Sequence, residues 1–398
     1  MRITDIRPRR ATALALTLIA TLATLGAARG VRSAPGEPTT ECPPDSTTAI
    51  APPATPFPPE SATAGVTHFT FIAYGDTRSR RDGTEIQPQH SRVMESMLAT
   101  IAGQAGGPDA VRFVVSSGDA TLSGRTAARW NVSYVPIIDR LTAGANVPFF
   151  SVVGNHDVSA SEDLTASARV EGLCHYFAAN AHLIPAENTP RRMNGYPTYA
   201  FGYGNTFFIA FDSNIAGDST QMAWIERQLA GLDRRRYVNV IALFHHPAFS
   251  SGPDDGARQE QQVLEVRARY MPLFEKYHVR LLLNGHEHLF EHWVEHYQDA
   301  TGTHRLDEIV SGGGGAPIYT FRAEPDLAGY LQANADRHVT VDHLVRPAAD
   351  TTGNPHHYLV VRVNGDEISV QVIGVDWGAS FAPYGSQAPF VLKDRPPQ

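Results

Sequence analysis

A recurring pattern constrains the fold of this 398-residue chain: apolar, β-rich segments that each end in a short polar loop. Five such segments occur, at residues 69–74, 111–115, 147–153, 238–244 and 279–283. Continuous apolar runs of this length indicate strands that are buried on both faces. Amphipathic stretches that predict helices lie between several of them, at residues 91–104, 221–232 and 260–277. Strands that alternate with helices predict an α/β layer architecture.

Two further pairs of strands are predicted as hairpins. Residues 199–212 and 357–375 show apolar alternation on both sides of a Gly-Asn or Asn-Gly turn. The segments 159–197 and 322–355 show no such pattern. We expect mostly irregular insertions there, and their length is typical of functional loops rather than of simple connections.

The polar loops at the strand ends supply side chains that bind divalent metal ions. They contain, in order, Gly75-Asp76, Gly118-Asp119, Gly154-Asn155-His156-Asp157, His245-His246-Pro247 and Gly285-His286-Glu287-His288. A single aspartate in such a loop is more often a turn or capping residue. Five loops in series instead indicate one site, because ligands of α/β folds gather at the carboxyl ends of strands. Carboxylate, amide and imidazole together favour Zn, Mn or Fe.

This ordered series of motifs, GD, GD, GNHD, HHP and GHEH, resembles that of the calcineurin-like metallophosphoesterase superfamily. It is most similar to the branch that contains the purple acid phosphatases. The resemblance runs from about residue 67 to residue 376, and it assigns a metallophosphoesterase domain to residues 65–380 and a C-terminal tail to residues 381–398. It implies a four-layer α/β/β/α sandwich of two mixed sheets flanked by helices, with the metal site at the carboxyl ends of strands.

The resemblance implies two divalent metal ions, which would be Zn, Mn or Fe. Asp119 would bridge the two ions, and Asp76 and His288 would complete the first site with it. The second site would be completed by Asn155, His245 and His286. In the HHP motif, His246 is the alternative to His245 as a ligand.

The resemblance also implies a catalytic pair. His156, held by Asp157, would lie over the substrate phosphate and either bind it or protonate the leaving oxygen. This agrees with the chemistry, because a leaving alcohol needs a proton and a carboxylate keeps an imidazole charged and oriented. The predicted reaction is hydrolysis of a phosphate monoester or diester by a metal-bound water whose pKa is lowered toward about 7.

Arg78 and Leu122 depart from the pattern of the superfamily. Most members have a histidine ligand two residues after the first aspartate, where this chain has Arg78. Purple acid phosphatases instead have a tyrosine three residues after the second aspartate, where this chain has Leu122. Either water fills the gap in the first site and Arg78 contacts the substrate phosphate, or the first metal binds weakly and Arg78 supplies the positive charge. The alternative structural role pairs Arg78 with a surface carboxylate.

A second class of function is a catalytically weak phosphoesterase fold that binds a phosphorylated ligand or partner. Arg78 and the two long insertions favour this interpretation, whereas His156, Asp157 and a complete second site favour an enzyme. The sequence leaves open the preference for monoesters or diesters, the identity of the metals and the oligomeric state.

The first 34 residues predict export of the protein. Residues 1–10 carry four arginines, and residues 11–28 form a nearly uncharged run, as is typical of a signal peptide. A retained membrane anchor is the alternative. Cleavage would leave a periplasmic or secreted protein with no membrane association. Residues 35–64, which are rich in proline and threonine, predict a flexible linker.

The net charge limits which partners the chain can bind, and the cysteines indicate the cellular compartment. Without residues 1–34 the chain has 27 basic and 40 acidic residues, a net charge of −13, so nucleic acid is not attracted in general. We expect a small phosphate ester that is bound locally by metals and a few positive groups. Cys42 and Cys174 fit an oxidising compartment, either as a disulfide or as two separate thiols.

Overall fold

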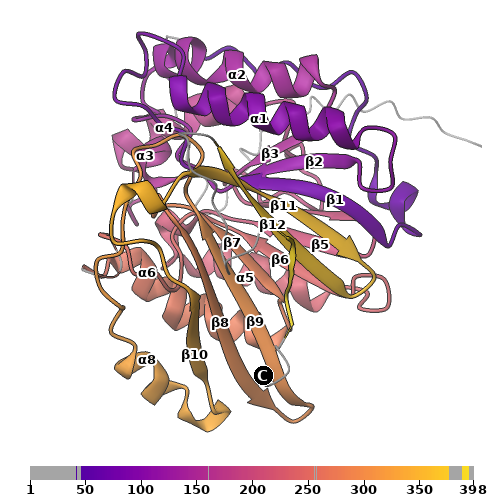
Figure 1. Ribbon diagram of the computed structural model, residues 1–398, viewed down its shortest axis with the longest axis vertical. Coiled ribbons are helices and arrows are strands. Elements are labelled where there is room, and N and C mark those ends of the chain that lie inside the picture. Colours follow the sequence, from indigo (N-terminus) through magenta and orange to yellow (C-terminus); the bar gives the residue numbers. More distant parts are fainter. Residues whose placement is uncertain are drawn as a thin grey trace, which may run out of the picture. The chain divides into compact units, whose positions relative to one another are not determined.

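Two mixed β-sheets pack face to face and carry helices on their outer faces (Figure 1). The computed structural model describes Cys42 and residues 46–159, 161–254, 256, 258–375 and 388–393. The chain divides into two units, Met1–Glu37 and Pro38–Gln398, and every described residue lies in the second. The predicted signal peptide and most of the predicted C-terminal tail lie outside the described residues, so both stay predictions.

The first sheet contains three of the strands that end at the predicted site. Its strand order is β13-β12-β11-β1-β2-β3. Strand β1 is parallel to β2, and β2 is parallel to β3, whereas β11 and β12 form an antiparallel hairpin beside β1. The bounds are β1 His68–Tyr74, β2 Val111–Ser116, β3 Phe149–Ser151, β11 His356–Asn364, β12 Glu367–Val375 and β13 Phe390–Val391.

The second sheet contains the other two strands that end at the predicted site, β6 and β7. Its strand order is β10-β8-β9-β7-β6-β5-β4. Strands β5, β6, β7 and β9 are parallel neighbours, and β4, β8 and β10 pair antiparallel at the two sides. The bounds are β4 Tyr199–Tyr203, β5 Thr206–Ala210, β6 Asn239–Leu243, β7 Leu281–Asn284, β8 Phe290–Asp299, β9 Gly302–Ser311 and β10 Thr340–Val345.

Helices cover the outer face of each sheet. Those over the first sheet are α1 Pro88–Gln104, η2 Arg129–Tyr134, α2 Val135–Asp139, η3 Arg140–Gly144 and α4 Ser167–Ala179. Those over the second sheet are α5 Ser219–Ala230, α6 Gln261–Glu265, η5 Val266–Tyr270 and α7 Met271–Lys276. The short helices are η1 Glu60–Thr63, α3 Asn155–Val158, η4 Ser213–Ile215, α8 Ala328–Ala333, η6 Ala335–Arg337 and η7 Thr351–Gly353. Within the part of the chain that the structure describes, no helix has the length and apolar character to cross a membrane.

The three cores explain why the strands read as continuous apolar runs. In β1, Phe69 and Phe71 face the opposite sheet, whereas Ile72 packs toward the helices. The ring of Phe71 stacks on Phe113 with centroids 5.3 Å apart, and Phe113 meets Phe208 of the second sheet edge-on at 5.4 Å. Because successive side chains alternate and both faces are buried, neither set of positions can be polar. The predicted four-layer α/β/β/α sandwich is confirmed.

The segments predicted as mostly irregular contain regular elements. Helix α4 lies within residues 159–197, and α8 and β10 lie within residues 322–355. Helix α4 buries Leu173 and Tyr176 in the core of the first sheet, and β10 pairs with the free side of β8. Outside α4, the described part of residues 159–197 consists mostly of turns and irregular backbone, so the prediction holds for most of that segment. The regular elements escape prediction because such short elements owe their stability to tertiary packing rather than to local propensity.

Residues 46–64, predicted as part of a flexible linker, lie against the domain. Ile50 is fully buried, and its backbone N–H donates to the carbonyl of Ala179 at 2.9 Å. The ring of Phe57 meets Phe150 edge-on with centroids 4.9 Å apart. Ile50 and Phe57 therefore anchor a segment whose composition predicts a flexible linker. Composition alone does not reveal these two anchors.

Cys42 and Cys174 form a disulfide, so the alternative of two separate thiols is excluded. The bond ties the start of the described chain to α4 across a sequence separation of 132. Beside it, Thr47 Oγ1 lies 2.8 Å from His175 Nδ1 on the same helix. The N-terminal arm and α4 therefore stabilise each other.

We expect the double variant Cys42→Ser/Cys174→Ser to lose about 2–5 kcal/mol of unfolding free energy, because the cross-link restricts the unfolded chain. Urea denaturation followed by tryptophan fluorescence measures the loss. Wild-type protein unfolded with a reductant should reproduce it. Equal midpoints for the double variant and the oxidised wild type would show that the disulfide does not stabilise the fold.

Candidate metal centre

The five predicted loops meet where the two sheets come together at the carboxyl ends of their strands. The backbone N–H of Asp76 donates to the carbonyl of Gly118, which joins the loops after β1 and β2. The backbone N–H of His286 donates to both carboxylate oxygens of Asp76 at 3.1 and 3.0 Å, which joins the two sheets. The structure thus brings together the six side chains that the sequence predicts as ligands: Asp76, Asp119, Asn155, His245, His286 and His288.

Three of these residues have left-handed backbone conformations. The φ angles of Asp76, Asp119 and His286 are 61°, 53° and 71°. For residues other than glycine this region costs roughly 1–2 kcal/mol, so it persists only where the surroundings enforce it. Here the loops pack so closely that a Cβ on Gly154 would lie 2.1 Å from Asp119 Oδ1. The glycine in the GNHD motif is therefore required by the close approach of two loops.

Four donor atoms converge at the predicted second site. Asn155 Oδ1 lies 3.0 Å from His245 Nε2 and 3.3 Å from His286 Nδ1. The two imidazole nitrogens are 3.3 Å apart, and Asp119 Oδ1 is 3.4 Å from His245 Nε2. A tetrahedral site with bonds of about 2.0–2.1 Å has ligand atoms about 3.3–3.4 Å apart. The donor set and its spacing therefore fit one divalent metal ion.

In His245 and in His286, one ring nitrogen has a contact outside the site, so the lone pair of the other ring nitrogen points into the site. His245 Nδ1 lies 2.9 Å from the carbonyl of Ser117, which can only accept, so Nδ1 carries the proton and Nε2 presents its lone pair. Burial lowers the pKa of His245 to about 4, which keeps the ring neutral as a metal ligand requires. For His286, Nε2 faces the carboxylate of Glu260 at 3.4 Å, which leaves Nδ1 for the site.

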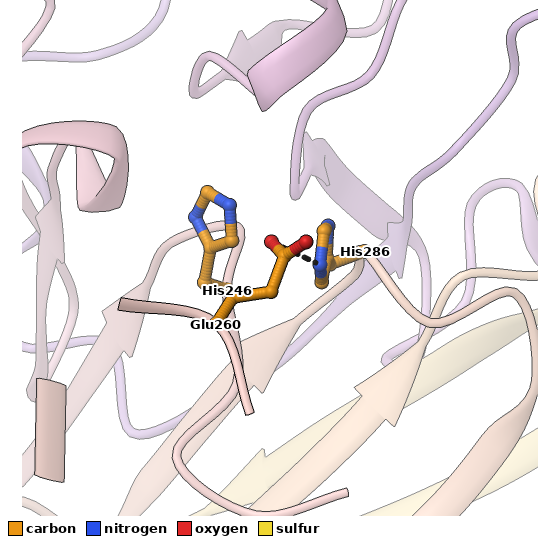
Figure 2. Close-up of side chains that lie close together, drawn as sticks. All are labelled: His246, Glu260 and His286. Atoms are coloured by element: carbon orange, nitrogen blue, oxygen red, sulfur yellow. Dashed lines mark ion pairs between the residues drawn. The ribbon is translucent and has the colours of Figure 1, made fainter. Parts of the chain in front are cut away.

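Glu260 is a site residue that the sequence analysis missed. Figure 2 shows its carboxylate between the rings of His246 and His286. Carboxylates in this position orient metal-bound histidines and raise their basicity. Glu260 stands just before α6, where an acidic residue is commonplace, so no local pattern marks it. Only the packing of α6 beside the β7 loop brings it to His286.

His246 lies outside the converging donors, so the structure favours His245 as the ligand. The hydroxyl of Ser213 accepts from the backbone N–H of His246 at 2.9 Å and lies 2.8 Å from its Nδ1. His246 Nδ1 is therefore engaged by the Ser213 hydroxyl, and His246 groups with Glu260 and His286 rather than with Asp119 and His245.

Arg78 forms hydrogen bonds with two atoms of the predicted first site. Its Nε donates to Asp119 Oδ2 at 3.1 Å, and its Nη2 lies 3.2 Å from His288 Nε2. His288 Nδ1 lies 2.7 Å from the carbonyl of Pro317, so Nδ1 carries the proton and Nε2 accepts from the arginine. Two of the three predicted ligands therefore bind a guanidinium, whereas the carboxylate of Asp76 lies close to that of Asp119 and to the ring of His245. The structural alternative, a pair with a surface carboxylate, is wrong because Asp119 is buried.

Tyr319 is a second residue that the sequence analysis missed. Its ring stacks on His288 with centroids 4.0 Å apart, and its backbone N–H donates to the carbonyl of the same residue at 2.8 Å. Burial raises the pKa of its hydroxyl to about 12, and the nearby positive charge of Arg78 opposes that rise. The residue follows the glycine-rich stretch 312–315, which is the only signal that the sequence offers.

The predicted pair of His156 and Asp157 is not formed. Both oxygens of Asp157 accept from backbone N–H groups, those of Gly154, Ala120 and Thr121, at 2.9–3.3 Å. His156 Nδ1 instead donates to the carbonyl of Leu122 at 2.8 Å. The prediction was wrong because adjacent residues of a helix, here α3, do not face each other. Asp157 positions the loop of Asp119, and a backbone carbonyl orients His156.

The buried carboxylates make the site electronegative. Burial alone would raise the pKa of Asp119, but His245, His156 and Arg78 together lower it, so this group is ionised. Burial and the neighbouring charge of Asp119 raise the pKa of Asp76 well above its usual range. The raised pKa of Asp76 reflects the cost of a second negative charge beside Asp119, and a divalent cation would offset that cost.

These features define a metallophosphoesterase, a fold that binds divalent metals between loops of two sheets. Residues 70–290, more than half of the chain, match the family model "Calcineurin-like phosphoesterase", and the protein belongs to that family. The predicted superfamily is confirmed.

The relatives include purple acid phosphatases. Purple acid phosphatase 23 of Arabidopsis thaliana is 23% identical over 188 residues, which are 47% of this chain and 37% of that protein. Probable inactive purple acid phosphatase 27 of the same plant is 24% identical over 276 residues, 63% of this chain and 42% of that protein. The chain thus spans less than half the length of these relatives. The solved structure of purple acid phosphatase PPD1 from yellow lupin shares the fold, with a TM-score of 0.57 at 18% identity, over 80% of this chain and 54% of that one.

We expect Glu260→Gln to weaken metal binding about 10- to 100-fold, because a neutral amide orients the His286 ring less strongly than a carboxylate. Isothermal titration of metal-free protein with Zn²⁺ or Mn²⁺ measures the change. Glu226→Gln, which alters a surface pair with Lys276, is the matched control. Equal affinity in the Glu260 variant and the wild type would remove Glu260 from the site.

Proposed function

We propose that the chain is a metal-dependent phosphoesterase that hydrolyses small phosphate esters. One observation carries the proposal: the lone pairs of His245, His286 and Asn155 converge with Asp119 at the spacing of a metal site. A divalent ion bound there supplies Lewis-acid stabilisation and lowers the pKa of a water molecule toward about 7. Zn, Mn and Fe all suit this donor set. The residues of the chain supply binding, orientation and proton transfer.

Arg78 and His156 supply groups for the substrate phosphate. The side chain of Arg78 is 14% exposed, so part of its guanidinium is open to a ligand. His156 is half-buried, and its backbone N–H donates to Asp119 Oδ1 at 3.0 Å. Nδ1 of His156 donates a hydrogen bond to the carbonyl of Leu122. Nε2 is therefore the ring atom left to bind a phosphate oxygen or to protonate the leaving alcohol.

A phosphate-binding protein without turnover is the second candidate. The engagement of Asp119 Oδ2 and His288 Nε2 by Arg78 favours it, because these two atoms then bind a guanidinium instead of a first metal ion. Some relatives carry the word inactive in their names, which is a statement about those proteins. Export to the periplasm or the cell exterior stays a prediction from the N-terminal sequence.

We expect metal-loaded wild-type protein to release p-nitrophenol from p-nitrophenyl phosphate or bis-p-nitrophenyl phosphate, with Zn, Mn and Fe tested in turn. Asp119→Asn should remove most of this activity and the bound metal, because the second site loses its only charged ligand. Asp109→Asn, at an exposed aspartate paired with His68, should change neither. Binding of inorganic phosphate without turnover of either ester would favour the second candidate instead.

We expect His156→Ala to lower kcat about 10²- to 10⁴-fold, the usual contribution of a general acid, while metal content stays near that of the wild type. Stopped-flow or plate-reader kinetics and elemental analysis of the same preparation give both quantities. His182→Ala, at an exposed histidine of the segment after α4, is the control. Loss of the metal in the His156 variant would show that this residue is a ligand or supports one.

A further inference from the structure

The guanidinium of Arg78 lies beside two of the donors that the sequence predicts for the first metal ion, Asp119 and His288. It contacts the two donors that a first ion would share, Asp119 Oδ2 and His288 Nε2, at 3.1 and 3.2 Å. These two hydrogen-bond partners come from the β2 loop and the β7 loop, and the ring of Tyr319, in the segment after β9, stacks on His288. The guanidinium is therefore held between loops of the two different sheets.

His288 Nε2 retains no free lone pair for a metal in this arrangement. His288 Nδ1 donates to the Pro317 carbonyl, so Nε2 carries the only ring lone pair, and that lone pair accepts from Arg78. A metal would bind Nε2 or a carboxylate oxygen at about 2.0–2.2 Å along the direction that the guanidinium takes. The ion and the guanidinium therefore exclude each other sterically, and their positive charges repel.

Asp119 still bridges two groups, but one of them is Arg78 instead of a metal ion. Its Oδ2 accepts from Arg78, whereas its Oδ1 lies with the second-site donors, 3.4 Å from His245 Nε2. The carboxylate thus links a guanidinium to the second site, where the family pattern would link two metal ions. A guanidinium carries a fixed positive charge and does not dissociate as a metal ion does.

We propose that Arg78 replaces the first metal ion, so that the protein is a mononuclear phosphoesterase in which one divalent ion and one guanidinium share Asp119. A guanidinium has five N–H donors, and Arg78 uses one for Asp119 and one for His288. The remaining N–H groups can donate to phosphoryl oxygens, which arginine binds well. The reaction rests on the proposed function above, whereas the metal stoichiometry does not.

The decisive measurement is the binding of Mn²⁺ to chelator-treated, full-length wild-type protein. Equilibrium dialysis with elemental analysis gives the number of ions per chain, and electron paramagnetic resonance at saturation shows whether two ions are adjacent. We expect an isolated-ion six-line spectrum and one tightly bound ion per chain. A spin-coupled Mn pair in the wild type would overturn the proposal, since two ions about 3.5–4 Å apart must couple.

The variant Arg78→His tests whether removal of the guanidinium allows a second metal ion to bind. It supplies a neutral imidazole and removes the positive charge, and we expect a second bound ion and a spin-coupled spectrum. Arg81→His, at a 70% exposed arginine of the same loop, should keep the single ion. If Arg78→His folds and still binds one ion with an uncoupled spectrum, the guanidinium is not what excludes the first metal. If that variant fails to fold, the wild-type spectrum alone decides.

Failure of the proposed function and failure of this inference give different results. A protein that binds one Mn²⁺ and hydrolyses neither nitrophenyl ester keeps the inference and loses the function. A protein that hydrolyses the esters with a coupled metal pair keeps the function and loses the inference.

Discussion

Asp119 holds an ionised carboxylate almost completely out of water, and the arrangement of the site follows from how that charge is compensated. On one side its Oδ2 accepts from Arg78, and on the other its Oδ1 faces His245 and accepts from the backbone N–H of His156. A buried charge without such partners would cost several kcal/mol. Its loop is fixed by Asp157, which accepts three backbone N–H groups. The second-site donors are therefore assembled around one buried anion.

Rigid strand ends make this assembly possible. The residues that carry the site follow β1, β2, β3, β6 and β7, whose cores are closely packed aromatic and aliphatic layers. The left-handed backbone at Asp76, Asp119 and His286 is tolerated because neighbouring loops leave no other path. Strain of this kind concentrates where preorganised geometry serves a function. Within this rigid frame, Arg78 changes the charge at the predicted first site, whereas the donors of the second site keep their arrangement.

The chain keeps one half of a family pattern and changes the other. The second-site donors have the spacing of a metal site, whereas two of the first-site donors bind Arg78. Arg78 places positive charge beside Asp119, and a divalent ion bound by the second-site donors would place more beside the same carboxylate. Family membership alone therefore does not define the chemistry of this site.

The sequence by itself indicated the five strands that end at the site, the α/β class and the six residues predicted as ligands, because buried strands and the polar loops that follow them are contiguous in the chain. It also marked Arg78 as the unusual residue. It did not determine the roles of Glu260 and Tyr319, the partners of His156, the packing of residues 46–64 or the choice between disulfide and free thiols. Each of these depends on contacts between segments far apart in the chain, or on the direction of a side chain on a short helix. Only the tertiary structure brings those atoms together.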